Sequence, residues 1–360
     1  MITKLNKVTS VIMSVSIILS ICIFCSCQQT ATSSFNNTSV TNNNTTTESD
    51  IKLETTPVEN FEYEIIDGEM SIEGYTGNDT EIVIPDVIDG INVTQIGLFA
   101  FQNTNLTSVI IPDTVTKISQ SAFDNCKSLS KVYIPDSVIE IGHAAFIHCS
   151  QLKEITIADR VHRIESSAFL DCTSLEKVCV RASAPDTNEY ELTELGESAF
   201  GDCTNLREIT IPSGITEIHS SALNGCVNLE SITLPNSLQE IGKEAFDDTK
   251  WYKNQPEGLL YLNHISVGVK GNISESNIMD GTSSILGLGN FESLSDVYIP
   301  ESVEYIQPDS IGFIYQTPDM DPVTGMPSWG DYSDNITIRG KTGSVAETYA
   351  KENNLNFVAE

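Results

Sequence analysis

One pattern of apolar residues returns every 23 residues through the middle of the chain. The segment that starts at Ile111-Pro112 is followed by equivalent segments that start at Ile134-Pro135 and at Ile157. Each segment contains an Ala-Phe pair, with a cysteine three residues after the phenylalanine. A fixed period of this length is typical of a solenoid, in which each repeat forms one coil and buries its apolar face against the next coil. The sequence therefore predicts one elongated repeat domain.

Three apolar groups in each repeat predict a coil with three buried sides. The first group, such as Val109 and Ile111, alternates with period two and indicates a short strand with one buried face. We expect the strands of successive coils to stack as a parallel ladder. The second group is represented by Val115 and Ile118, and the third is the Ala-Phe pair. A proline after most of the strands has no N–H group and ends the ladder there.

Five cysteines occupy the same position of the repeat, three residues after the large apolar residue of the third group. They are Cys126, Cys149, Cys172, Cys203 and Cys226. The equivalent positions at the two ends hold Thr104 and Thr249, so the position accepts small side chains. We predict a buried row of free thiols rather than disulfides or a metal site. Cys179 has the outward parity of its strand and is predicted to be the more reactive thiol.

Residues 1–27 resemble an export signal of the bacterial lipoprotein type. Lys4 and Lys7 precede an apolar stretch, and Phe24-Cys25-Ser26-Cys27 resembles a lipobox in which Cys27 is acylated. We therefore expect an extracytoplasmic protein that a lipid at Cys27 holds on the bacterial membrane or cell surface; an uncleaved membrane anchor and plain secretion are the alternatives. Residues 28–57 are rich in Thr, Ser and Asn and are predicted to be a disordered tether.

The acidic composition excludes some partners and leaves others open. The chain has 19 Lys and Arg against 50 Asp and Glu, a net charge of −31. This charge repels nucleic acid and anionic lipid and favours basic partners or cations. The five histidines are scattered, and the sequence contains no zinc-binding pair, nucleophile elbow or phosphate-binding loop. We predict no catalytic residues, no metal and no cofactor, and hence no enzyme.

The residues of the repeat resemble the BspA-type leucine-rich repeat of bacterial surface proteins. The resemblance lies in the segment from Ile134 to Leu152, in Trp251 to Leu259 and in Gly340 to Tyr349, and it extends over about Phe61 to Glu360. It implies adhesion and binding roles at the cell surface, diverse partners and no shared catalytic residues. It also implies a leucine-rich-repeat-like α/β solenoid.

The fold that we expect is a right-handed stack of 23-residue coils with a parallel β-ladder and short helical segments. Ser344 and Glu347 form a capping box, which predicts a C-terminal capping helix over Val345 to Asn353. Within a repeat domain at 58–360, the expected parts are an N-terminal cap at 58–100, regular repeats at 101–246, a variant island at 247–290, interrupted last repeats at 291–340 and the capping helix at 341–360.

The candidate binding residues lie where the repeat is interrupted or where a strand faces outward. The segment 312–335 holds Tyr315, Trp329 and Tyr332, and a shorter insertion holds Tyr190. Tyr133 and Tyr298 are expected on the outward strand face. We expect recognition of an extracellular macromolecule, foremost a protein, by a monomer. A carbohydrate-binding module and a structural spacer without a ligand remain the alternatives. In a structural spacer, the aromatic residues of 312–335 would fold back on the array.

Overall fold

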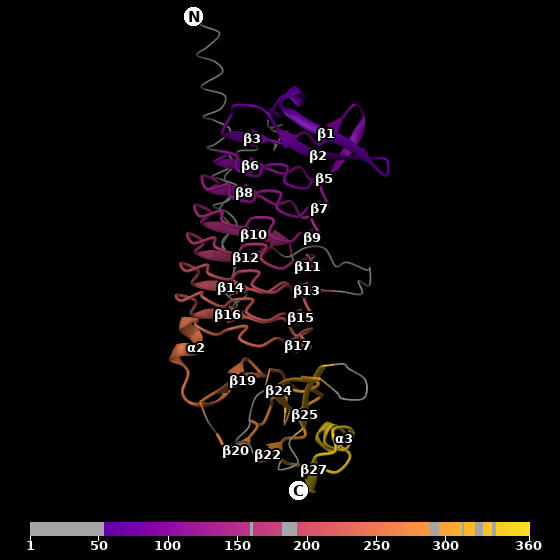
Figure 1. Ribbon diagram of the computed structural model, residues 1–360, viewed down its shortest axis with the longest axis vertical. Coiled ribbons are helices and arrows are strands. Elements are labelled where there is room, and N and C mark those ends of the chain that lie inside the picture. The colour runs from indigo at the N-terminus through magenta and orange to yellow at the C-terminus, as the bar shows by residue number, and fades with distance from the viewer. Residues whose placement is uncertain are drawn as a thin grey trace, which may run out of the picture.

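The computed structural model describes residues 54–158, 161–181, 193–271, 273–287, 295–311, 313–320, 327–332 and 336–360. They form an elongated stack of coils that begins with the N-terminal strands at one end and finishes with the C-terminal strand at the other (Figure 1). Within these ranges, no helix has the length and apolar character that a membrane crossing requires. We call residues 101–246 the regular coils and residues 247–360 the C-terminal coils.

The strand at the start of each repeat forms the expected parallel ladder along one side of the stack. Val109 pairs with Val132, and Ile155 pairs with Val178, so equivalent residues of successive repeats lie side by side. The ladder consists of two sheets. The first sheet contains β3 (Glu81–Val83), β6 (Ser108–Ile110) and β8 (Lys131–Tyr133), and the second contains β10 (Glu154–Ala158), β12 (Lys177–Arg181), β14 (Glu208–Thr210) and β16 (Ser231–Thr233). The two sheets are separate because β8 and β10 are not paired.

The second apolar group of each repeat forms another parallel ladder, on a second side of the stack. Each of its regular strands has only two residues, such as Lys117 and Ile118. A strand of this length is too short to show a period-two pattern in the sequence. The ladder runs through β1 (Phe61–Ile66), β2 (Glu69–Tyr75), β5 (Ile91–Ile96), β7 (Lys117–Ile118), β9 (Glu140–Ile141), β11 (Arg163–Ile164), β13 (Glu194–Leu195), β15 (Glu217–Ile218) and β17 (Glu240–Ile241), with β4 (Val87–Ile88) paired to β5.

The third side of each regular coil consists of turns. Helices are few among the described residues and are confined to the short η1 (Val58–Asn60) and α2 (Lys250–Asn254) and to α3 (Val345–Glu352). Two residues in each of these turns have left-handed backbone, such as Ser121 (φ 53°) and Asn125 (φ 59°). A helix cannot continue through such residues, and their N–H groups bond to the neighbouring coil instead. The Ser121 N–H donates to His143 O at 2.9 Å, and the Asn125 N–H donates to Ile147 O at 2.9 Å.

A column of stacked phenylalanine rings runs through the core of the regular coils. The ring centroids of Phe101 and Phe123 are 4.9 Å apart with an interplanar angle of 3°, which is offset stacking. The column continues from Phe123 to Phe146 at 4.9 Å, from Phe146 to Phe169 at 5.2 Å and from Phe169 to Phe200 at 4.9 Å. Every ring of this column is at most 1% exposed. The repeat thus places identical side chains against each other from coil to coil.

The predicted row of free thiols lies beside this column and is confirmed. All five cysteines of the row are buried and unpaired. Each thiol donates to the carbonyl oxygen of the phenylalanine one coil earlier, as Cys149 does to Phe123 O at 3.2 Å. Burial raises the pKa of Cys126 to about 11, and it also raises the pKa of Cys149 well above that of a free thiol. The expectation for Cys179 is wrong: its side chain is 1% exposed, and its Sγ lies 3.8 Å from Glu154 Oε1.

An antiparallel hairpin closes the N-terminal end of the stack. β1 pairs with β2, and β2 pairs in parallel with β5, so the hairpin covers the edge of the second ladder. The residues before this hairpin also pack on the stack. Thr56 is 8% exposed, and its N–H group donates to Val83 O at 2.9 Å. A short 3₁₀ turn, η1 (Val58–Asn60), connects this segment to β1.

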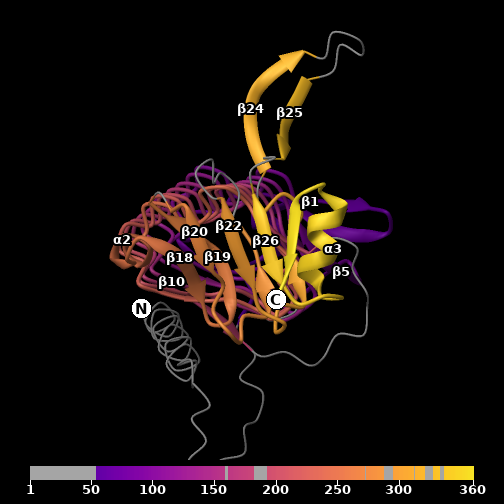
Figure 2. The same ribbon diagram turned by 90° about the horizontal axis from the view of Figure 1, so that it is seen from below.

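The C-terminal coils keep the stacking direction but change the chain path. Helix α2 (Lys250–Asn254) leads to the antiparallel pair β18 (Gly258–Leu262) and β19 (Ile265–Lys270), and then to β20 (Glu275–Asn277), β21 (Ser284–Ile285), β22 (Asp296–Ile299), β23 (Tyr305–Ile306) and β26 (Thr337–Gly340). Residues from Ile278 to Leu355 form a second, smaller core. β24 (Phe313–Met320) and β25 (Pro327–Tyr332) form a hairpin that projects from the stack (Figure 2).

The predicted C-terminal helix is present as α3 (Val345–Glu352), and it packs on the second core through Ala346, Tyr349 and Ala350. Its capping box is incomplete. Glu347 Oε2 accepts from the Gly343 N–H at 2.6 Å, whereas the Ser344 side chain makes no capping bond. The helix does not end the ladder, because β27 (Asn356–Ala359) follows it and pairs in parallel with β26.

Candidate functional site

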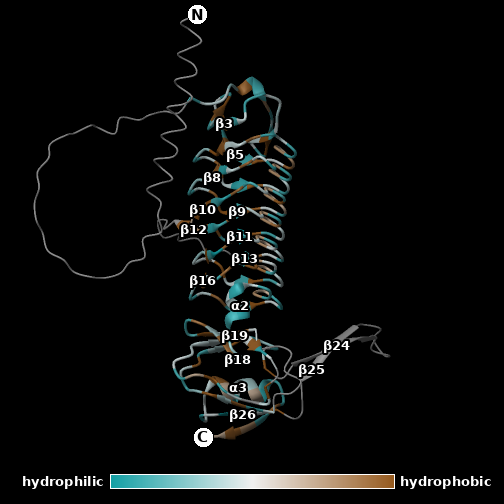
Figure 3. Cartoon of the chain, turned by 90° about the vertical axis from the view of Figure 1, so that its left-hand side faces the viewer, coloured by the Kyte–Doolittle hydropathy of each residue, from teal (hydrophilic) through white to brown (hydrophobic). Residues whose placement is uncertain are grey.

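The outward residues of the first ladder form a row of alternating charge. Lys177 lies between Glu154 and Glu208 in the register, and the Lys177 ammonium pairs with the Glu208 carboxylate. Figure 3 views the stack from this side and shows polar and apolar residues mixed from coil to coil. Ion pairs of this kind on a solvated face contribute little stability, so the row mainly neutralises itself.

The two strand tyrosines that the sequence singles out do not come together. Tyr133 is half-buried on β8 of the first ladder, whereas Tyr298 lies on β22 in a different sheet. The Arg339 guanidinium carbon lies 5.9 Å from the Tyr298 ring centroid, and Arg339 also pairs with Asp296 at 2.6 Å. Tyr298 therefore packs within the protein's own polar network and is not part of a shared aromatic surface with Tyr133.

The second ladder changes from mixed to acidic charge along the stack. Early coils pair opposite charges, as in Lys117 with Glu140 at 2.8 Å. From the middle of the stack onward, Glu194, Glu217 and Glu240 occupy successive rungs. His219 Nε2 lies 3.2 Å from a Glu194 oxygen and 3.7 Å from a Glu217 oxygen. This acidic run points toward the junction with the C-terminal coils.

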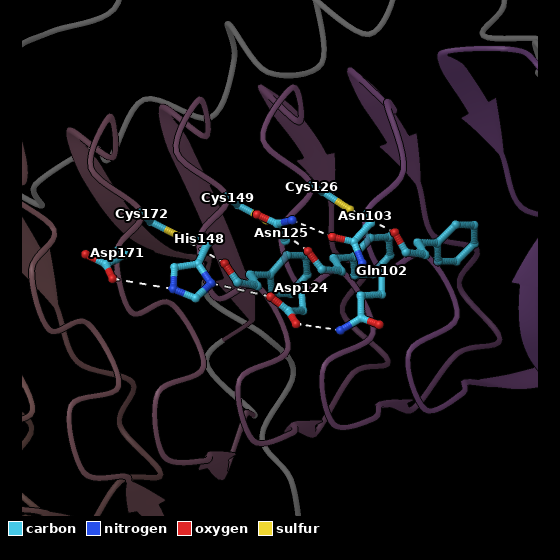
Figure 4. Close-up of polar contacts among 12 residues, drawn as sticks. Gln102, Asn103, Asp124, Asn125, Cys126, His148, Cys149, Asp171 and Cys172 are labelled. Carbon is cyan, nitrogen blue, oxygen red and sulfur yellow. Dashed lines mark hydrogen bonds and ion pairs between the residues drawn. The ribbon is translucent and has the colours of Figure 1, made fainter.

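Polar side chains at and beside the left-handed turn positions tie adjacent coils together (Figure 4). The left-handed residues are Asn103, Asn125, His148 and Asp171, and their neighbours are Gln102 and Asp124. Gln102 donates to Asp124 at 2.7 Å, and Asn125 donates to Asn103. His148 Nδ1 lies 3.5 Å from an oxygen of Asp124, and its Nε2 lies 3.6 Å from one of Asp171. Asn, Asp and His tolerate left-handed backbone better than most residues, which accounts for these residue types. Among the described residues, no group of three or more His, Cys, Asp and Glu side chains has a geometry suited to a metal ion.

The interruption at 312–335 is a hairpin, where the sequence had indicated an irregular loop. Tyr315 lies on β24, and Trp329 and Tyr332 lie on β25. The register pairs Tyr315 with Gly330 and Phe313 with Tyr332, so the three aromatic positions fall within one short stretch of ribbon. Tyr190 and Cys27 lie outside the described residues.

A pocket at the junction between the regular and the C-terminal coils is the feature that the sequence analysis missed. Its volume is about 740 Å³. Its wall contains the last regular turn, Lys243 to Asp247, and a later turn, Gln307 to Ser310, together with Tyr252 and residues of β18 and β19. The only sequence signal was the interruption of the repeat after residue 246.

One glutamine side chain replaces the missing ladder bonds beside this pocket. Gln307 Oε1 accepts from the N–H groups of Ile241 and Gly287, both at 3.1 Å, and its Nε2 donates to Ile241 O at 3.3 Å. Gly287 has a φ of 67°, and a Cβ at this position would lie 2.7 Å from Val267 O. The primary amide thus acts as a peptide group on the side of β17 that faces away from β15, where no described strand pairs with β17.

The parallel ladders, the recurring phenylalanine column and the recurring turns define a leucine-rich repeat solenoid. The chain belongs to the family described as the BspA type leucine rich repeat region, whose model matches six copies over residues 75–190 and 187–285.

Two solved structures illustrate the likeness. A leucine rich cell surface protein from Faecalibacterium prausnitzii is 27% identical over 71% of this chain and 72% of its own, with a TM-score of 0.46. A leucine rich repeat protein of T. pallidum is 28% identical over 53% of this chain and 86% of its own, with a TM-score of 0.43. A comparison with curated protein sequences finds no match.

Proposed function

We propose that this chain is a binding protein of the bacterial cell surface, held there by a lipid on Cys27, which recognises an extracellular macromolecule, foremost a protein. Membership of the BspA-type family supports the surface location, and the resemblance of residues 24–27 to a lipobox supports the anchor. Repeat proteins of this family act as binding or structural scaffolds, which supports recognition without catalysis.

The observation that carries the proposal is the hairpin of β24 and β25. It projects from the side of the stack (Figure 2), and it carries Tyr315, Trp329 and Tyr332 near its paired base, where Phe313 pairs with Tyr332. Aromatic residues dominate the energetics of protein interfaces, and a rigid scaffold lowers the entropy that binding costs. The hairpin is therefore the element that we assign to partner recognition.

Binding of the labelled protein to intact cells tests this role. Residues 51–360, which contain both cores, are compared with a variant in which Tyr315, Trp329 and Tyr332 are all replaced by Ser. A control replaces Tyr63, an exposed tyrosine at the opposite end of the stack, by Ser. We expect cell binding to fall at least about tenfold in the triple variant only. Equal binding by all three proteins would remove the hairpin from the proposal.

Treatment of the target cells identifies the kind of partner. Protease treatment should abolish binding if the partner is a protein, whereas periodate treatment should abolish it if the partner is a glycan. The anchor is tested by the substitution Cys27→Ala, which should release the chain from the membrane fraction. Retention of this variant in the membrane would contradict the lipid anchor.

A further inference from the structure

The junction pocket interrupts a hydrogen-bond pattern that all regular coils share. In each regular coil, the N–H group of the large apolar turn residue donates to the alanine carbonyl of the next coil. Phe123 donates to Ala145 O at 2.7 Å, and Leu223 donates to Ala245 O at 2.9 Å. The next donor in this series is the N–H group of Phe246. The N–H group of Glu244 continues a second series, that of the left-handed residues, in which Ser221 donates to Lys243 O at 2.9 Å. Neither the Phe246 nor the Glu244 N–H group has a hydrogen-bond partner among the described residues.

The facing wall repeats the same turn and offers acceptors. Asp309-Ser310-Ile311 matches Glu244-Ala245-Phe246, with left-handed backbone at Asp309 (φ 61°) and at Glu244 (φ 58°). In the regular coils, the carbonyl at the position of Ser310 accepts from the coil before it, but within the described structure no donor reaches Ser310 O. The Ser310 side chain is 2% exposed, and its hydroxyl also lacks a partner there. Buried polar groups without partners are costly, so both walls favour an occupant with backbone-like donors and acceptors.

The charge of the pocket selects among such occupants. Glu240, Glu244, Asp247 and Asp309 line it, against Lys243 as its one basic lining residue among those described. Partial burial, together with the nearby carboxylates of Glu244 and Asp248, raises the pKa of Asp247. A cationic group placed beside Asp247 would stabilise the ionised carboxylate and lower its pKa again. The acidic run of Glu194, Glu217 and Glu240 leads along the second ladder to the same place.

We propose that the junction pocket binds an extended segment of a partner polypeptide that carries a lysine or arginine side chain. The segment pairs its carbonyl groups with the N–H groups of Glu244 and Phe246 and donates its own N–H groups to the facing wall at Ser310 O, as an added strand pairs with an open sheet edge. Its basic side chain lies beside Asp247, and its apolar side chains contact Leu260, Val267 and Val269. The inference rests on the proposed function only for the class of partner, because none of the described residues that line the pocket belongs to β24 or β25, and the pocket has its own donors.

Calorimetric titration of the full chain in a nonionic detergent tests the site with synthetic probes. The probe is an acetylated and amidated (Val-Lys)₃ peptide, compared with (Val-Glu)₃, with spermidine and with (Val-Lys)₃ that is N-methylated at each valine. We expect saturable binding of (Val-Lys)₃ and no saturable binding of (Val-Glu)₃ or spermidine. The N-methylated form of (Val-Lys)₃ should bind at least about tenfold more weakly, because it loses backbone N–H donors. Binding of spermidine or of the N-methylated peptide as tight as that of (Val-Lys)₃ would overturn the proposal, since charge alone would then explain it.

Two charge-matched variants place the binding in the pocket. Asp247→Asn should weaken (Val-Lys)₃ binding about fivefold, whereas Glu64→Gln, an exposed carboxylate on β1, should leave it unchanged. Val269→Trp fills the pocket and should abolish binding while the circular dichroism spectrum stays that of the parent protein. Equal binding by all four proteins would overturn the site. Failure of every peptide to bind would also overturn it, while the cell-binding test of the hairpin would stand unaffected.

Discussion

The regular coils and the C-terminal coils are built from the same turns, but they satisfy their backbone groups in different ways. In the regular coils, each turn receives hydrogen bonds from the coil before it and donates to the coil after it, from Phe101 to Leu223. After Phe246 this exchange stops. Trp251 covers the Phe246 ring at 5.8 Å in an edge contact, and the Gln307 amide takes over the bonds of β17. Repetition thus gives the backbone N–H and C=O groups of each turn a partner in the next coil. Where the repeat is interrupted, another group of the protein must replace this partner, or the backbone groups are left to bind a ligand.

The largest expected difference between the two regions follows from their thiols. Burial raises the pKa of Cys126, Cys149, Cys172 and Cys203, and all of them lie in the regular coils. Since the unfolded thiols ionise above a pH of about 8.5 while the folded ones stay protonated, stability is lost as the pH rises from 8.5 through the folded pKa values, at about 1.4 kcal/mol per thiol and pH unit. Urea unfolding at pH 8 and pH 10 measures this loss. An unfolding midpoint of the regular coils that does not change with pH would contradict the buried row.

The next largest effect is expected from the phenylalanine column. Phe146→Ala removes a ring that stacks on both neighbours, and we expect a loss of about 3–5 kcal/mol in the free energy of unfolding. Tyr252→Ala in the C-terminal coils removes a partly buried ring and should cost less than about 2 kcal/mol. Urea unfolding of both variants gives the comparison. Equal losses in the free energy of unfolding would show that the phenylalanine column stabilises the protein no more than Tyr252 does.

The coupling between the two regions depends on Gln307. Gln307→Ala leaves the N–H and C=O groups of Ile241 and the N–H group of Gly287 without their partner, and we expect a loss of about 2–3 kcal/mol. Because these bonds connect the last regular coil to β23, the variant should unfold in two calorimetric transitions. Glu304→Ala, which removes an exposed side chain three residues earlier, is the control. A single transition at the parent temperature would contradict the coupling.

A smaller effect is expected from the donor at the cysteine position. Cys149→Val and Cys149→Thr add the same bulk, but Val removes the donor to Phe123 O, and it should cost about 1 kcal/mol more than Thr. Thr keeps a donor: the Thr104 hydroxyl in the same repeat position bonds Phe101 O of its own coil at 2.8 Å. Thermal unfolding of both variants measures the difference, and a more stable Val variant would show that packing alone selects the residue.

The smallest effect is expected at Asp247, where binding and stability oppose each other. Its raised pKa means that the ionised form is disfavoured in the folded protein, so stability falls as the pH rises through that pKa. Asp247→Asn should therefore raise the free energy of unfolding at pH 7 by about 0.5 kcal/mol, since the group is only partly buried. A loss of stability in this variant would indicate that the carboxylate has a structural partner.

The sequence predicted those features that repeat, together with the C-terminal helix, and missed the contacts that occur only once between distant parts of the chain. The period of 23 residues was enough to predict the first ladder, the phenylalanine column and the thiol row, because each of them recurs in equivalent positions. The conformation of the turns was not predicted, since the backbone preference of Ser121 or Asn125 is weak in the sequence and decisive only with a neighbouring coil present. The contact of Gln307 with Ile241 joins residues 66 positions apart, and the pocket depends on where the interrupted chain runs in space, which no local pattern encodes.

Hydrogen exchange of the turn amides, resolved by residue, tests the central claim most directly. The N–H groups of Phe101, Phe123, Phe146, Phe169, Phe200 and Leu223 are each bonded to the following coil and should exchange slowly. The Phe246 amide holds the same repeat position without such a bond and should exchange much faster. An exchange rate at Phe246 as slow as that at Phe123 would show that another group already occupies this side of the pocket, and it would contradict both the break in the pattern and the site that we derive from it.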